Sequence, residues 1–365
     1  MPTNSIELSE KNFKKLNKLK EKNNFHDKTW DEWFNFSFPD ENEKKYSDKI
    51  IENILVKNAY GQYFDEWINN FSLNLNEIWN GYSARDLTPK VIPDESSAIV
   101  IGRGPSIQKF NHLDLLAKSD FQGSIICTDG ALISALKHGV TPDKFKNFFV
   151  VSIDSHDYIS KYYDHDLILK YGNKIKCILS STISPSTYQK AKNNKMQVYW
   201  LHTLFDHDKG KSSFNHISAI MVRSKNHKNG LPAIQTGGNV GTSCWVMGWS
   251  ILKCSNIALI GIDHGFPKGT GLEEIGTAHP SCKTALNLDQ NSKIFQKAFP
   301  TIYNPDFDCY CIQDPIFQYY GNALKEFIPK ASKYVKTINA TEGGAIFGEG
   351  IQCMKFTEFL KNFSI

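Results

Sequence analysis

Three aspartates in this sequence each follow a short apolar run, at the point where a β-strand would end. Asp129 follows IICT, Asp154 follows VVSI and Asp263 follows IALIGI. Carboxylates at such positions commonly bind ribose hydroxyls, a divalent ion or a substrate amine. A lone aspartate there is often only the N-cap of the next helix. Three of them together favour a functional site, in which we predict a catalytic role for Asp154.

Two histidines end further apolar runs in the same way. His202 lies in WLHT and His264 in IDHG. Imidazole is the natural general base near neutral pH, although most individual histidines have no catalytic role. We predict that His202 or His264 serves as the catalytic base.

Two glycine-rich segments add a second kind of signal. AIVIGRGPS leads from an apolar run into a turn, and QTGGNVGTSCW opens an apolar helix. Exposed backbone N–H groups beside a helix N-terminus bind anions such as phosphate, although both segments also suit a tight turn or close helix packing. Neither matches the GxGxxG or GxxxxGK[ST] patterns of standard dinucleotide and ATP sites. We predict a different nucleotide site, contacted by Gly102, Arg103, Gly104, Pro105, Ser106, Asp129, Gly130, Gly237, Gly238, Asn239, Thr242 and Asp263.

The elements that must position these residues alternate regularly from Ser97 onward. Apolar runs rich in β-branched residues, such as AIVIG, GSIICT, FFVVS, KCILSS, QVYWLHT and NIALIG, are separated by segments of helical pattern. Such runs predict a mostly parallel sheet with helices on both faces. Right-handed crossovers bring the carboxyl ends of all strands to one edge. The sequence therefore predicts an α/β fold with its site at that edge.

The first part of the chain differs from the rest. Residues 1–93 are rich in Lys, Glu and Asn, with apolar positions at helical spacing, and we predict a helical N-terminal region followed by an α/β domain at 94–365. The polar stretch 206–230 reads as a mobile loop that could form a lid.

The composition excludes some classes of protein. A formal net charge of +4 over 365 residues is too small to predict nucleic acid as a general partner. No segment resembles a signal peptide or is apolar for the roughly 18 residues of a membrane span. Eight cysteines without a CxxC pair suit reduced thiols. We therefore expect a cytoplasmic protein.

Several of these segments together resemble a known family. VIGRGPSI, ICTDGALISALKHGVTPD, FVVSID, TGGNVGTSCWVMGWSILKCSNIALIGIDHGF and INATEGGA are similar to the family built on the archaeal 6-hydroxymethylpterin diphosphokinase domain, which also forms the centre of the motility accessory factors. The resemblance implies a Rossmann-like nucleotide-binding transferase domain related to bacterial sialyltransferases. It also implies that Gly102, Gly104, Pro105 and Ser106 contact the nucleotide, and that Asp129 and Asp154 line the pocket.

The family contains two chemistries, and the resemblance leaves both open. In the favoured one, a glycosyltransferase moves an acidic, nonulosonate-type sugar from a CMP-sugar to a protein or glycan acceptor. There His202 or His264 deprotonates the acceptor, and Arg103 stabilises the leaving phosphate. In the alternative, a 6-hydroxymethylpterin diphosphokinase uses ATP with magnesium, and Asp129 and Asp154 hold the metal. A third reading is a non-catalytic nucleotide-binding module. The oligomeric state stays open.

Overall fold

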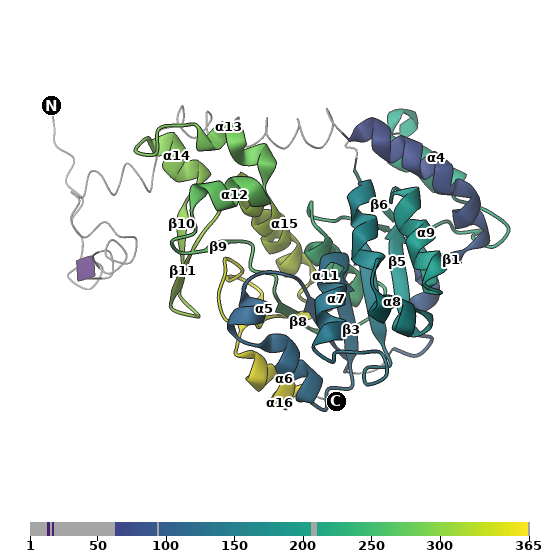
Figure 1. The fold of residues 1–365 in the computed structure, drawn as a ribbon, viewed down its shortest axis with the longest axis horizontal. Coiled ribbons are helices and arrows are strands. Elements are labelled where there is room, and N and C mark those ends of the chain that lie inside the picture. The colour runs from purple at the N-terminus through teal and green to yellow at the C-terminus, as the bar shows by residue number, and fades with distance from the viewer. Residues whose placement is uncertain (1–12, 15–16, 18–62, 93–94, 206–209, 364–365) are drawn as a thin grey trace.

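The computed structural model describes residues 13–14, 17, 63–92, 95–205 and 210–363. Within them a ten-stranded sheet forms the centre of the molecule (Figure 1), in the order β1-β6-β5-β4-β3-β2-β8-β12-β13 with β7 paired to β6. The pairings of this sheet are parallel. Its strands are β1 Tyr82–Ser83, β2 Ser97–Ile101, β3 Ser124–Thr128, β4 Phe148–Ser152, β5 Lys176–Ser180, β6 Gln197–Thr203, β7 Ala233–Ile234, β8 Asn256–Ile260, β12 Lys336–Asn339 and β13 Ile351–Cys353. The predicted parallel sheet is confirmed.

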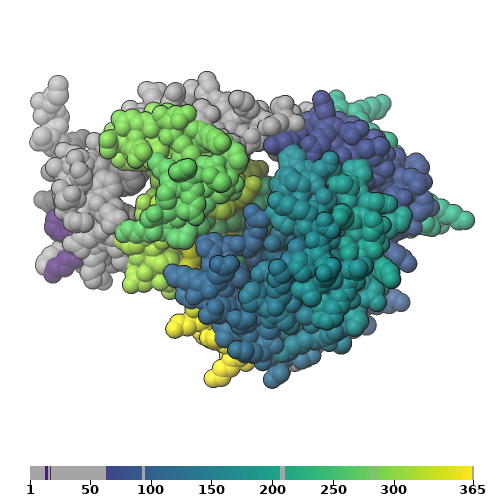
Figure 2. Space-filling model, viewed as in Figure 1, coloured from purple at the N-terminus to yellow at the C-terminus, as the bar shows by residue number. Residues whose placement is uncertain are grey.

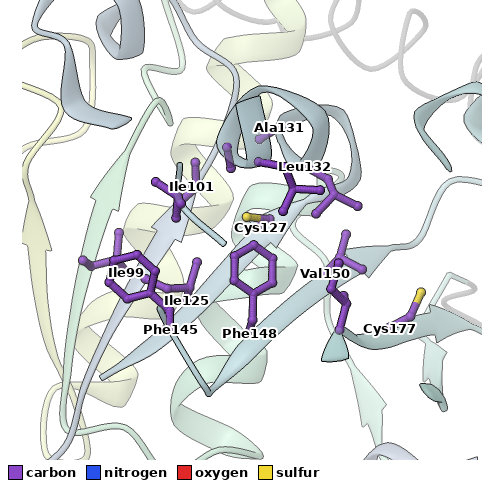
Figure 3. Close-up of a cluster of buried hydrophobic side chains, with 14 of the residues drawn as sticks. Ile99, Ile101, Ile125, Cys127, Ala131, Leu132, Phe145, Phe148, Val150 and Cys177 are labelled. Carbon is purple, nitrogen blue, oxygen red and sulfur yellow. The ribbon is translucent and has the colours of Figure 1, made fainter. Parts of the chain in front are cut away.

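The central strands are apolar along their whole length because both of their faces are covered. All five residues of β2, β4 and β8 are buried. Figure 3 shows one face, where Ile99, Ile101 and Phe148 lie beneath Ala131 and Leu132 of the helix that follows β3. Alternate residues such as Val100 point to the opposite face, into a second apolar cluster.

Helices cover both faces of the sheet, as predicted. Buried residues of α6, α7, α8, α9 and α16 join the first cluster, and those of α11 and α15 join the second. The helices are α4 Phe64–Asn80, α5 Ser106–Lys109, α6 His112–Lys118, α7 Asp129–Lys137, α8 Asp166–Tyr171, α9 Pro185–Asn193, α10 Phe214–Met221, α11 Val240–Ser250, α12 Leu272–Ala278, α13 Lys283–Leu286, α14 Lys293–Ala298, α15 Pro315–Ala331 and α16 Phe356–Asn362. Shorter 3-10 turns are η1 Ala84–Leu87, η2 Asp157–Tyr163, η3 Gly172–Lys174, η4 Gly210–Ser212 and η5 Pro280–Cys282. Among the described helices, none is long and apolar enough to cross a bilayer.

A small lobe follows β8 that the sequence pattern did not reveal. Its three antiparallel strands are β9 Phe266–Pro267, β10 Thr301–Asn304 and β11 Cys309–Ile312, in the order β10-β11-β9. They pack with α12, α13 and α14 around a third apolar cluster that includes Ile275, Phe295 and Phe299. In Figure 1 this lobe, drawn in green, lies beside the main sheet and leads into α15.

Two predictions about segments outside the central sheet can be compared with the structure. Residues 63–92 are the continuous described part of the N-terminal region. They contain the helix α4, as expected, and the strand β1, which joins the main sheet beside β6. The prediction that 206–230 is a loop was wrong for its described part, which contains α10. Ser213 caps that helix by accepting the N–H of His216, and the Ser218 hydroxyl is buried against His202. Residues 206–209 of this stretch lie outside the described residues.

Candidate functional site

The turns after β2 and β8 pack directly against each other at the centre of the sheet edge. The Gly102 N–H donates to Ile260 C=O and the Gly104 N–H to Gly261 C=O, each at 2.8 Å. A Cβ on Gly102 would lie 2.2 Å from the Gly261 oxygen, so the two backbones meet only without side chains. Between β2 and β8 the strand order also changes direction, which is where open α/β sheets bind ligands. The glycine turn therefore lies at the predicted position, and packing is one reason for its glycines.

The side chain of Asp263 stabilises this turn through a hydrogen bond. Its carboxylate accepts the Ser106 hydroxyl at 3.0 Å, and the residue is 6% exposed. Burial raises the pKa of the Asp263 carboxyl to about 6, against the hydrogen bonds from Ser106 and the charge of Lys109. A Cβ on Gly104 would lie 1.8 Å from Asp263 Oδ2. Asp263 therefore holds the turn in shape, and its contact with a nucleotide stays a prediction.

The second glycine-rich segment, QTGGNVGTSCW, is stabilised by hydrogen bonds between its own residues. Asn239 caps α11: its Oδ1 accepts the Thr242 N–H at 2.8 Å and its amide donates to Thr242 Oγ1 at 2.9 Å. Gly237 and Gly238 have φ values of 58° and 82°, which favour glycine. A Cβ on Gly238 would lie 2.6 Å from the Tyr319 ring. The close packing of this segment on α15 accounts for its composition without a ligand.

Asp129 lies at the end of β3 as a buried carboxylate. It accepts the Ser152 hydroxyl and the Gly130 N–H, both at 2.7 Å. Burial raises the pKa of the Asp129 carboxyl to about 6; the two hydrogen bonds lower it, Asp154 raises it again and Arg103 lowers it. The pKa of Asp129, at the end of β3, therefore depends on charged residues that follow β2 and β4.

Arg103 connects the glycine turn to η2. Its Nη1 donates to the Tyr162 hydroxyl at 2.6 Å. One turn earlier, the Tyr158 hydroxyl donates to Asp154 Oδ2 at 3.1 Å. The Lys161 ammonium lies 5.2 Å from the centroid of each of these two rings. Two cations and two phenols therefore line the edge between the turn and Asp154.

His156, which the sequence analysis did not select, lies beside Asp154. Its Nδ1 is 3.0 Å from Glu66 Oε1 of α4, and its Nε2 is 3.9 Å from Asp154 Oδ1. The Tyr63 ring packs edge-on against the imidazole, with centroids 4.3 Å apart. A carboxylate that accepts the Nδ1 proton leaves the lone pair on Nε2. His156 is thus a half-buried imidazole whose ring is oriented by Glu66, with its Nε2 on the side of a second carboxylate.

Buried amides hold α4 in place for this contact. The Asn70 amide donates to Ser155 C=O at 2.9 Å and to Thr182 C=O at 3.2 Å. One turn later the Asn74 amide donates to Ile183 C=O at 2.7 Å. Because both amides are almost fully buried, α4 has a fixed register on the loops after β4 and β5. That register brings Glu66 to His156.

The structure does not bring the two predicted histidines to the glycine turn as free bases. His202 lies on β6, four strand spacings from β2, or roughly 19 Å, and its two ring nitrogens bond to Ser181 and Ser218. His264 follows β8 directly, but it is buried against Phe317, and burial lowers its pKa to about 3. His202 is therefore a packed core residue, and His264 has little basicity.

A cavity of about 340 Å³ opens beside the glycine turn. Its lining combines the turn with α5, α6 and α7, and includes Arg103, Gly104, Gln108, Leu113 and Ser134.

The helix α15 lies on the other side of the strand ends. The pKa of its Tyr320 phenol is raised mainly by burial and also by the charge of Asp154. In Figure 2 the surface is hollowed between the green lobe and the blue and teal body. The strand ends are thus bordered on both sides by surfaces that could contact a substrate.

The carboxylates offer limited metal-binding capacity. Within the described ranges, no three His, Cys, Asp or Glu side chains cluster as a metal site would require. Asp154 is near enough to raise the pKa of Asp129, and two neighbouring carboxylates suit Mg²⁺ when substrate phosphates and water complete its shell.

The strand order and the position of the site define an open, Rossmann-like α/β protein. Residues 69–269 match the family model described as 6-hydroxymethylpterin diphosphokinase MptE-like, and the chain belongs to this family. The solved structure of the MAf glycosyltransferase from Magnetospirillum magneticum AMB-1 has a similar fold, with a TM-score of 0.52 and 15% sequence identity. The similarity covers 79% of this chain and 38% of that one, so this chain spans well under half of that protein. No curated protein matched the sequence.

Proposed function

We propose that this protein is a glycosyltransferase that moves an acidic, nonulosonate-type sugar from a CMP-activated donor to a protein or glycan acceptor. The observation that carries the proposal is the His156–Glu66 pair beside Asp154, on the same edge as the Arg103–Tyr162 contact. Sugar transfer needs two groups, a base oriented by a carboxylate and a cation that stabilises the leaving phosphate. Family membership and the fold similar to a glycosyltransferase support it.

Each group has a defined part in this mechanism. His156 Nε2 takes the proton of the acceptor hydroxyl while the hydroxyl oxygen bonds to the anomeric carbon of the sugar. The bond from that carbon to the donor phosphate breaks, and CMP leaves with the bonding electrons. Asp154, 3.9 Å from Nε2, stabilises the imidazolium that forms. Arg103, whose guanidinium donates to the Tyr162 hydroxyl beside the glycine turn, stabilises the charge on the leaving phosphate.

The test is CMP release from CMP-linked nonulosonates by wild type and by His156→Asn. We expect kcat to fall by roughly 10²- to 10⁴-fold, because that is the usual contribution of a general base. CMP affinity should stay within about twofold, because the base does not hold the nucleotide. His216→Asn is the control, since His216 is exposed on α10. An active wild type whose His156→Asn variant keeps its kcat contradicts the assignment.

A second candidate, 6-hydroxymethylpterin diphosphokinase, is favoured by the Asp129–Asp154 pair. The negative charge of Asp154 contributes to the raised pKa of the Asp129 carboxyl, so the two carboxylates are near each other. Bound Mg²⁺ would neutralise the phosphates of ATP during transfer. Formation of AMP from ATP in the presence of a hydroxymethyl pterin, abolished by EDTA and by Asp129→Asn, would establish this activity. Binding of CMP or ATP without turnover in either assay would identify a nucleotide-binding module.

A further inference from the structure

The surface formed by α10 and the end of α4 combines exposed apolar and basic side chains. Ile217, Ile220 and Met221 lie at positions i, i+3 and i+4 of α10 and are 40%, 54% and 40% exposed. That spacing places them on one side of the helix. Trp79, at the end of α4, is 39% exposed and donates its indole N–H to Met221 C=O at 2.7 Å. We call these four residues the α10 stripe.

The α10 stripe is held rigidly. The turn that follows α10 closes on the end of α4: the Asn226 amide donates to Trp79 C=O at 3.2 Å. The buried His227 ring bonds to Gly81 C=O at 2.9 Å. These contacts satisfy carbonyl groups that the last turn of α4 leaves without helical partners. The apolar side chains therefore stay exposed on a fixed support.

Basic residues flank the stripe on the side where α10 ends. Arg223, Lys225 and Lys228 are exposed, and residues 210–230 contain no Asp or Glu. Asp206 and Asp208 precede the segment in the sequence and lie outside the described residues. On the α4 side, Glu77 is engaged with Tyr188 and Lys192. The surface is thus locally cationic, although the whole chain carries a formal charge of only +4.

We infer that the α10 stripe and its three flanking cations dock this protein on an anionic lipid bilayer. A short helix with an aliphatic side, an indole and adjacent Lys or Arg residues is the combination that binds at a membrane interface. The aliphatic groups enter the boundary between headgroups and acyl chains, and the cations face lipid phosphates. An acidic protein partner would also match the cations, but the combination of an aliphatic helix face, an indole and adjacent cations favours the bilayer. The inference rests on this surface alone and does not depend on the proposed transferase activity.

The test is co-sedimentation of the full chain with vesicles of phosphatidylglycerol and phosphatidylcholine, compared with vesicles of phosphatidylcholine alone. We expect binding to the anionic vesicles that weakens as salt is raised. The triple variant Arg223→Gln, Lys225→Gln, Lys228→Gln should bind on the order of 100-fold more weakly, because each cation contributes roughly fivefold. The variant Ile217→Ser, Ile220→Ser should also lose binding. The matched control Lys118→Gln, Lys333→Gln, Lys336→Gln removes three exposed cations elsewhere and should bind like wild type.

Three results would overturn the inference. The first is no difference between anionic and neutral vesicles, and the second is equal losses in the two triple variants. The third is no vesicle binding together with salt-sensitive binding to polyglutamate, which would assign the surface to an acidic protein. Because the two isoleucines are already exposed, the serine variant should keep the wild-type circular dichroism spectrum. If it does not, the charge variants alone decide the outcome.

Discussion

Replacing Asp263 by Asn should make the protein more stable at neutral pH, with a gain that depends on pH. The carboxyl is 6% exposed, and burial raises its pKa from 3.8 to about 6. A carboxyl with a raised pKa in the folded state binds its proton more tightly there than in the unfolded chain. Its contribution to the free energy of unfolding is therefore complete below pH 3.8 and is lost as the pH rises through 6.

The size of this effect follows from the shift in pKa. At about 1.4 kcal/mol for each pKa unit, the shift corresponds to about 3 kcal/mol, of which about 2 kcal/mol falls between pH 4.5 and pH 7.5. Asn carries no charge, and its Oδ1 can still accept the Ser106 hydroxyl. The free energy of unfolding of Asp263→Asn, relative to wild type, should therefore rise by about 2 kcal/mol over that range.

Urea unfolding followed by tryptophan fluorescence measures this difference at each pH. Asp120→Asn is the control, because Asp120 is exposed, and its difference from wild type should be independent of pH. If Asp263→Asn also shows a constant difference, the Asp263 carboxylate does not carry a burial penalty, and the reasoning about the glycine turn is refuted.

Two further predictions concern the same edge of the sheet. Gly104→Ala should destabilise the protein by about 1–3 kcal/mol or more, since the new Cβ would lie 1.8 Å from Asp263 Oδ2; an unchanged urea midpoint would contradict this packing. Asn70→Ala should cost about 1–3 kcal/mol, because it leaves two buried carbonyls without donors. By loosening α4 it should also lower kcat through Glu66 and His156, an effect that a kcat equal to wild type would exclude.

The sequence predicts the central sheet well because each strand is buried on both faces. Runs such as SAIVI and FFVVS have no polar side to accommodate, so composition alone marks them. The lobe after β8 escaped prediction because its strands have two to four residues, too few for a period to show. The helix α10 escaped because Asn, His, Lys and Gly around it resemble a loop, whereas its N-cap and its packing on α4 stabilise it.

The site was predictable in its position but not in all of its residues. Asp129, Asp154 and the glycine turn lie at strand ends, where the pattern points to them. His202 was selected for the same reason, yet the sequence cannot show that β6 lies four strands from β2. His156 was overlooked because its partner, Glu66, is 90 residues away in a helix whose docking depends on buried amides. The spacing Asp154, His156, Tyr158 and Tyr162 was the only local signal.

The central claim of the proposed function is that the strand ends bind a cytidine nucleotide. A calorimetric titration of wild type and Arg103→Met with CMP, in the presence of EDTA, tests it most directly. We predict saturable binding to wild type at one site per chain and at least tenfold weaker binding to Arg103→Met, since an ionic hydrogen bond contributes about 1.5–3 kcal/mol. No binding of CMP, with saturable binding of ATP only when magnesium is present, would contradict the account and favour the diphosphokinase.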